Sequence, residues 1–291
     1  MKKIIVTLTV ILSISFSQGL SGVSYFGYSD DDGFELTRTY LTYDKEVSDV
    51  LSFKLQTDVG QISDDRWDVY LKKAQLDWVL DNGYKLSMGL IGNNMFNVQE
   101  KTWGNRFVAK SVLDKAAWDI WAADLGIGFS KSFGNISTSL LITNGEGYKH
   151  SNVDDNQMLS VQVVYGEKRL DKNDGYNIGL VYSTLDLDAS ITTRQVTGVF
   201  GGWSNGDIRL YIEEYNKSTT NLSDNELSAI GVNYAIVNHL SFFARQDVQD
   251  DVETLITGFV WTPTKGLNIC PNVTQSDNID DEFKVNFQFK F

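Results

Sequence analysis

Apolar and polar residues alternate along most of this 291-residue chain. The pattern is clearest in residues 281–291, which read DEFKVNFQFKF: from Phe283 on, every second residue is Phe or Val, with Lys, Asn and Gln between them. A period of two places neighbouring side chains on opposite faces of a β-strand, and it excludes a helix. One apolar face and one wet face suit a strand between lipid and a water-filled lumen, so the pattern predicts a transmembrane β-barrel.

Runs of the same kind, separated by turns, predict about sixteen antiparallel strands. Asn82-Gly83 marks a tight hairpin between two of them. Single-chain bacterial barrels have an even number of strands. Sixteen strands satisfy this rule, and counts of about 14 or about 18 strands would satisfy it too. The expected strands are 20–29, 34–45, 50–59, 67–80, 84–92, 121–132, 136–143, 158–165, 176–184, 189–203, 207–215, 226–236, 240–247, 252–262, 267–274 and 281–291.

The connections between these strands fall into two groups. Those that follow even-numbered strands are short, except 166–175, whereas the longest connection, 93–120, follows an odd-numbered strand. With both chain ends on the periplasmic side, the short connections are periplasmic turns and 93–120 is the third external loop. Residues 109–117 of this loop have the composition of a helix.

The N-terminal residues have the pattern of a cleaved signal peptide. Lys2 and Lys3 precede the apolar run 4–14, and Ser15 and Ser17 are small residues before a cut after residue 17. The apolar run is too short for a spanning helix. We therefore expect a signal peptide over 1–17 and an exported, single-domain transmembrane barrel over 18–291.

Composition narrows the function classes. The formal net charge of −13 argues against a nucleic-acid partner, and a single cysteine cannot form an internal disulfide. The two histidines, His150 and His239, fall in a loop and a turn, and no serine-hydrolase, zinc-protease or phosphate-loop motif is present. We expect no catalytic residue, no metal and no cofactor, and hence a protein that is not an enzyme.

The signal peptide, the serial amphipathic strands, the long third loop and the terminal Phe291 together resemble Gram-negative outer-membrane porins. The pattern around the third loop is similar to the phosphate-selective porin O/P group, and it lacks the acidic PEFGG-like motif of general diffusion porins. The resemblance implies a homotrimer in the outer membrane, surrounded by lipid and lipopolysaccharide. It also implies that the third loop folds into the lumen and that the barrel-assembly machinery recognises Phe291.

The candidate site is the narrowest part of this lumen, because a sixteen-stranded barrel leaves an aqueous channel. The third loop is locally basic, and alternation places further basic residues of the strands on the lumen side, where Asp58, Asp77, Asp124 and Glu213 offset them. Cationic side chains at a narrow point raise the local concentration of anions. The candidate channel-lining residues are Lys101, Arg106, Lys110 and Lys115 of the loop, and Arg38, Lys54, Lys73, Arg209 and Arg245 of the strands.

The sequence thus favours a porin for the passive diffusion of small polar solutes or ions, with anions such as phosphate among them. Two alternatives remain: a substrate-specific uptake channel for an apolar solute, and a non-conducting surface or adhesive barrel. Electrical conductance in planar bilayers separates a porin from a non-conducting barrel. The sign of the ion selectivity stays open at this point.

Overall fold

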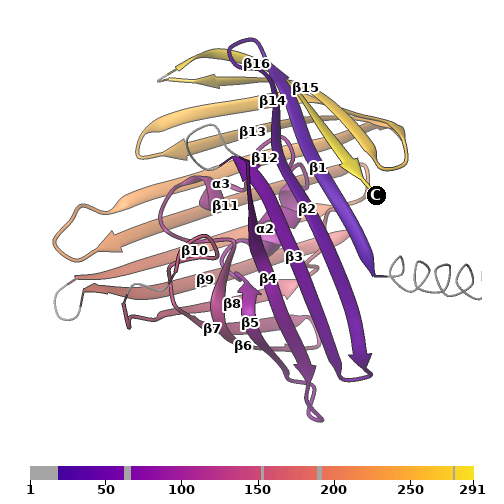
Figure 1. Ribbon diagram of the computed structural model, residues 1–291. Helices are drawn as coiled ribbons and strands as arrows, with labels where there is room; N and C mark the ends of the chain where they lie inside the picture. Colours follow the sequence, from indigo (N-terminus) through magenta and orange to yellow (C-terminus); the bar gives the residue numbers. More distant parts are fainter. Residues whose placement is uncertain (1–18, 62–66, 152–153, 189–191, 278) are drawn as a thin grey trace, which may run out of the picture.

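The computed structural model describes residues 19–61, 67–151, 154–188, 192–277 and 279–291. They form sixteen antiparallel strands, each paired with its neighbour in the chain, and β1 pairs with β16 to close the barrel (Figure 1). The predicted all-β barrel is confirmed, and so is its strand number. The expected signal peptide, 1–17, lies outside the described residues. The strands are β1 (Leu20–Ser29), β2 (Gly33–Ser48), β3 (Leu51–Gln61), β4 (Trp67–Val79), β5 (Lys85–Gly92), β6 (Ala123–Phe133), β7 (Ile136–Thr143), β8 (Met158–Gly166), β9 (Gly175–Asp188), β10 (Thr192–Ser204), β11 (Ile208–Thr219), β12 (Asn225–Val237), β13 (Leu240–Gln249), β14 (Val252–Thr264), β15 (Leu267–Ser276) and β16 (Ile279–Lys290).

The bounds of β1 and β7 are those expected from the sequence. Several strands run further than predicted, and β9 and β11 do so by the most: β9 continues to Asp188 rather than 184, and β11 continues to Thr219 rather than 215. The outward positions Asp186, Asn216 and Ser218 are polar, so the apolar outward face ends before the backbone ladder does.

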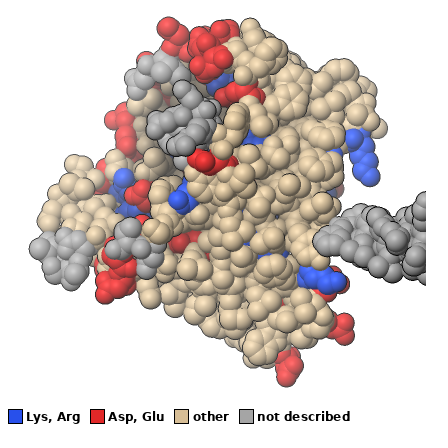
Figure 2. Space-filling model, in the orientation of Figure 1, with Lys and Arg blue, Asp and Glu red and all other residues tan. Residues whose placement is uncertain are grey.

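The two ends of the barrel differ in their connections. We call the end with the β1–β2, β3–β4, β5–β6 and following odd-to-even connections the loop end, and the other the turn end. Both described chain termini lie at the turn end, since β1 begins there and β16 finishes there. Figure 2 shows acidic residues gathered toward the loop end, with a broad uncharged surface between the two ends.

The outer wall exposes large apolar side chains on every second position. Leu180 is 60% exposed, and Ile212 and Ile230 are each 57% exposed, while inward neighbours such as Val181 are buried. At the turn end, exposed aromatic residues ring the wall, as they do at a membrane–water boundary. Lys131 lies over two of these rings, with its Nζ 4.1 Å from the centroid of Tyr84. The ring includes Trp78, Tyr84, Phe133, Tyr165, Tyr176, Trp203, Tyr234, Trp261 and Phe289.

The seam between β1 and β16 closes the sheet. The Phe26 and Phe287 rings stack at 4.7 Å between centroids on the outer face. The backbone N–H of Gly22 donates to the carbonyl of Phe291 at 2.8 Å, and the Phe291 N–H donates back to Gly22 at 3.1 Å. The Phe291 ring also packs over Gly22, where a Cβ would stand 2.2 Å from a ring atom, so the ring would have to move to admit a larger residue.

The β5–β6 connection, the predicted third loop, lies inside the barrel (Figure 1). It contains two short helices, α2 (Asn97–Trp103) and α3 (Val112–Lys115). The helix expected over 109–117 is therefore confirmed only over α3, and α2 was not predicted. The signal for α2 is Gly104, which ends the helix in the left-handed conformation with φ 77°. Among the described residues, no helix is both long and apolar enough to cross a membrane.

Candidate functional site

The third loop covers one side of the lumen because α2 is amphipathic. Its residues Val98, Gln99, Thr102 and Trp103 are buried against the inner wall, whereas Asn97 and Lys101 face the lumen. Two apolar clusters hold the loop on the β8–β15 side. One joins Met95, Phe96, Val98, Val112, Leu113 and Trp118 to Val164, Val181, Val196, Phe200, Tyr215 and Leu227, and the other joins Trp103 and Phe107 to Tyr211, Phe243, Ile256 and Val260.

Polar contacts fix the loop in register with the wall. The Gln99 side chain donates to the Tyr215 hydroxyl at 3.1 Å, and that hydroxyl donates to Glu213 at 2.7 Å. Asn105 donates to Asn233 at 2.6 Å. Because most of these contacts lie on the β8–β15 side, the open lumen remains on the opposite side, along β2–β7.

Two predicted channel-lining arginines lie in this anchor. Arg245 is 1% exposed, pairs with both oxygens of Asp247 at 2.6 Å, and donates to the carbonyl of Lys110 at 2.8 Å. Its guanidinium stands 4.8 Å from the Trp103 ring centroid. Arg209 donates to the Trp103 carbonyl at 3.0 Å. Alternation placed both side chains inward, but it could not show that the loop covers Arg245.

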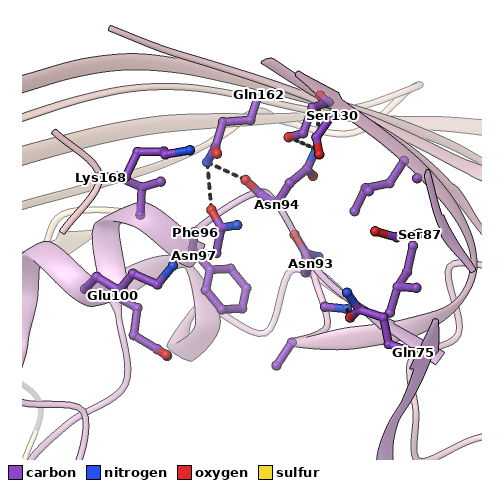
Figure 3. Close-up of a pocket in the computed structure, with 18 of the residues that line it drawn as sticks. Gln75, Ser87, Asn93, Asn94, Phe96, Asn97, Glu100, Ser130, Gln162 and Lys168 are labelled. Carbon is purple, nitrogen blue, oxygen red and sulfur yellow. Dashed lines mark hydrogen bonds between the residues drawn. The ribbon is translucent and has the colours of Figure 1, made fainter. Parts of the chain in front are cut away.

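The open lumen is a cavity of about 840 Å³ between the third loop and β4–β7 (Figure 3). Its wall carries hydroxyl and amide groups from the strands, among them Gln75, Ser87 and Ser130. The loop contributes Asn93, Asn94, Phe96, Asn97, Glu100, Lys101 and Arg106. In Figure 3 the Gln162 amide bridges the Asn94 carbonyl and the Asn97 side chain, which ties the start of α2 to β8.

Charged side chains and one tyrosine meet where the loop faces β2–β4, and we call them the loop–wall cluster. It consists of Arg38, Asp58, Lys72, Glu100, Arg106, Asp114 and Tyr148. Arg38 forms an ion pair with the fully buried Asp58, which also accepts a 2.6 Å hydrogen bond from Tyr148 of the β7–β8 loop. Arg106 pairs with Glu100 at 2.9 Å and with Asp114 at 3.2 Å. Each of the three carboxylates in the cluster therefore has an arginine partner.

The positive charges of the lysines around this cluster are not neutralised by a carboxylate. Lys72 donates to the Tyr40 hydroxyl at 3.3 Å and lies 4.4 Å from the ring centroid. Among the lysines of the described chain that have no carboxylate oxygen within 4.0 Å, five lie in or beside this cluster. These lumen lysines are Lys72, Lys73, Lys101, Lys110 and Lys149.

Burial changes the titration of the loop groups. It lowers the pKa of Lys101, of Lys110 and of Lys149 below the ordinary lysine value, because the charged ammonium loses water. Burial also opposes the charge of Arg106, but Glu100 and Asp114 outweigh it and raise the pKa of that guanidinium. Arg106 is therefore the permanent positive charge of the loop.

The remaining predicted residues lie at different levels of the barrel. Lys73, Lys101 and Arg106 line the main cavity, with Arg38 and Lys110 beside them. Lys54 pairs with Asp44 at 2.7 Å near the turn end. Lys115 lines a separate cavity of about 340 Å³ and Arg209 lines one of about 200 Å³.

Sequence reasoning missed Lys72. Strand β4 has one extra residue at this point, because Gln56 pairs with Lys73 while Thr57 pairs with Leu71. This β-bulge lets Lys72 and Lys73 both face the lumen. Two consecutive lysines in an otherwise alternating strand were the available signal, since alternation would leave one of them in lipid.

Comparisons with known proteins give a match at the level of the fold. No protein-family model matches this chain, and no curated protein sequence does. A trimer form of OmpT, an outer-membrane protein of Vibrio cholerae, matches with a TM-score of 0.68 and 12% identity over 94% of this chain and 98% of that chain.

Two further solved structures are similar. An anion-selective porin from Comamonas acidovorans matches with a TM-score of 0.67 and 12% identity, over 94% of this chain and 98% of that one. OmpF of Salmonella typhi, in complex with daunomycin, matches with a TM-score of 0.66 and 11% identity, over 94% and 97%. The chain thus has the sixteen-stranded fold of outer-membrane porins, and identities this low speak for the fold alone.

Proposed function

We propose that this protein is an outer-membrane porin that lets small polar solutes diffuse passively and that prefers anions. The observation that carries the proposal is the charge balance of the lumen. All three carboxylates of the loop–wall cluster are bound by Arg38 or Arg106, while the five lumen lysines have no such partner in the described residues. A permeating anion meets ammonium groups and few competing carboxylates.

These charges act on an ion inside the channel at physiological ionic strength. The Debye length is then about 8 Å, so an ion passing a few ångströms from Lys72 or Arg106 is only partly screened from them. The lysines also influence one another across the lumen: Lys110 lies near Lys72, and Lys73 lies near Lys101. The acidic loop end does not reverse this effect, because exposed acids in open water are screened more strongly.

Phosphate is the finer part of the proposal. Arginine and lysine bind oxyanions through charge-assisted hydrogen bonds, and Arg106 is held in place by Glu100 and Asp114. The similarity to the anion-selective porin of Comamonas acidovorans supports anions in general, and the sequence resemblance to the phosphate-selective porin O/P group supports phosphate among them.

Localisation and assembly follow from the outer wall. A closed barrel with an apolar outer band and aromatic residues at its turn end fits the outer membrane, with the turn end in the periplasm. The OmpT match is to a trimer form, which supports a homotrimer here. We further propose that Phe291, on the closing seam, is recognised by the barrel-assembly machinery.

Ion selectivity in planar bilayers tests the proposal. Under a potassium chloride gradient, the reversal potential should give an anion-to-cation permeability ratio above one. Arg106→Ala and Lys110→Ala should each lower this ratio by about twofold to fivefold, the effect of one nearby charge in water. Lys265→Ala is the matched control, because Lys265 is an exposed residue of the β14–β15 turn.

The same measurement decides between the alternatives. A ratio below one in the wild-type channel, or loop variants that behave like Lys265→Ala, would contradict the anion preference. Absence of stable current steps would favour a non-conducting surface barrel. Saturable uptake of an apolar solute with little ion current would favour the substrate-specific channel instead.

A further inference from the structure

The β8–β9 turn (residues 167–174) differs from the other turns of the turn end. Most of these connect strands by a few residues, whereas this one is longer and folds against the inner wall. Leu170 is only 2% exposed. A Cβ on Gly202 would stand 2.8 Å from the Thr102 methyl group and 3.0 Å from a Leu170 methyl group, so the turn, β10 and α2 meet there.

Hydrogen bonds hold the turn in this position. Asn177 of β9 donates to the Glu167 carbonyl at 2.7 Å and to the Thr102 hydroxyl of α2 at 3.5 Å. The backbone N–H groups of Lys172 and Asn173 both donate to the Arg169 carbonyl, at 2.9 and 2.8 Å. The β8–β9 turn is therefore a second ordered segment, and it contacts the third loop from the turn end.

The three basic residues of the turn have different surroundings. Arg169 is neutralised by a two-bond contact with Asp171, at 2.8 Å for each bond. Lys172 is exposed and lines the small 200 Å³ cavity. Lys168 lines the main cavity, and it has no ion pair within the residues described.

Lys168 is not alone on this side of the lumen. Asn97 and Lys101, one turn apart on the open face of α2, line the same cavity, and the charges of Arg169 and Lys168 act on Lys101. In Figure 3, Lys168 projects into the same cavity that Gln162, Asn97 and Glu100 line. Two ammonium groups and an amide that offers N–H donors are a suitable set for the oxygens of an anion.

We propose that the β8–β9 turn is a second selectivity element, in which Lys168, Lys101 and Asn97 form an oxyanion-binding subsite at the turn end of the lumen. This proposal rests on the anion-conducting porin proposed above. Oxyanions such as phosphate leave the loop–wall cluster and are held once more before they exit. The subsite adds a specificity that the third loop alone does not provide.

Block of chloride current by inorganic phosphate, added at the turn end, tests the subsite. Lys168→Gln should raise the half-blocking phosphate concentration by about threefold or more, the effect of losing one nearby charge. Lys172→Gln, a lysine of the same turn outside the main cavity, should leave it unchanged. Replacing residues 168–173 by Asn-Gly should also raise the single-channel conductance, because the inward segment is removed.

Equal phosphate block in wild type, Lys168→Gln and Lys172→Gln would overturn the subsite. This outcome is distinct from failure of the porin proposal, which would show in the wild-type reversal potential. The two point variants keep the test decisive if the shortened turn does not fold. Heat-dependent migration of the folded barrel on gels establishes that each variant is assembled.

Discussion

At the scale of single residues, arginine and lysine have different tasks in this lumen. Arg38 and Arg106 bind carboxylates, and Arg245 binds both Asp247 and the loop backbone. A planar guanidinium makes several directed hydrogen bonds at once, which suits it to hold structure. Lysine presents a single point charge, and Lys72, Lys73 and Lys101 present theirs to the open cavity.

This division predicts the pH dependence of selectivity. Lys101, Lys110 and Lys149 have a lowered pKa, so they lose their positive charge as pH rises, before the ordinary value of 10.5 is reached. Arg106, whose pKa is raised, stays charged. We expect the anion-to-cation ratio, from reversal potentials between neutral pH and about 10, to fall without disappearing. The double variant Lys101→Arg/Lys110→Arg should retain more of it, and a ratio that is constant up to pH 10.5 in wild type would contradict the assignment.

At the scale of elements, the bulge in β4 yields a sharper prediction than any point variant. Deletion of Lys72 joins Leu71, which faces outward, to Lys73, which faces inward, and thereby restores simple alternation. The barrel should assemble normally and should lose anion preference as Lys72→Gln does, by about twofold to fivefold. Reversal potentials of the two variants test this equivalence.

Deletion of the neighbouring Leu71 is the matched control. It would move Lys72 into the outward position that Leu71 now occupies, with 45% exposure. A lysine on the lipid face is costly, so this variant should assemble poorly. If the two deletions behaved alike, the bulge would not lie at Lys72.

The strands could be predicted because each one separates lipid from the water-filled lumen, which makes apolar and polar residues alternate. In β16, side chains that face water alternate with side chains that face lipid: Asn286 and Gln288 are buried inside, whereas Phe283 and Phe289 are exposed outside. Helix α2 gave a weaker signal, since its buried face is mixed, with Gln99 and Thr102 beside Val98 and Trp103. Val98 and Trp103 pack into the apolar clusters on the wall, whereas Gln99 and Thr102 meet polar groups of Tyr215 and Asn177.

The candidate site was predictable in kind but not in arrangement. Alternation gives the face of Arg38 and Asp58, but their ion pair joins β2 to β3, and Tyr148 reaches it from another loop. Which acids remain free depends on such contacts between distant segments. The inward position of the β8–β9 turn could not be predicted either, because one buried leucine, Leu170, among charged residues gives no periodic pattern.

At the scale of the whole molecule, the charge of the loop end is opposite in sign to that of the lumen. The chain carries a net charge of −13, with its acids gathered toward the loop end, yet the middle of the lumen is basic. An anion must therefore pass an acidic rim before it meets the lysines. Solutes with both charge and hydroxyl groups would also meet the serine hydroxyls of β5–β7 and the amide of Gln75 along the way.

The inside-out distribution of polar residues can be tested with the same substitution on the two faces of the wall. Leu180 faces outward, two outward positions from Tyr176 of the aromatic ring, whereas Ser137 lines the main cavity. In lipid bilayers, Leu180→Arg should lower the free energy of unfolding by about 2–4 kcal/mol, because the guanidinium replaces an apolar side chain within the lipid. Ser137→Arg should leave that free energy nearly unchanged and should raise the anion-to-cation ratio, since its charge enters water. Denaturant titration in vesicles measures the first effect and reversal potentials measure the second. Equal loss of stability in both variants would mean that the lumen is not water-filled at Ser137, and equal tolerance would mean that lipid does not cover Leu180.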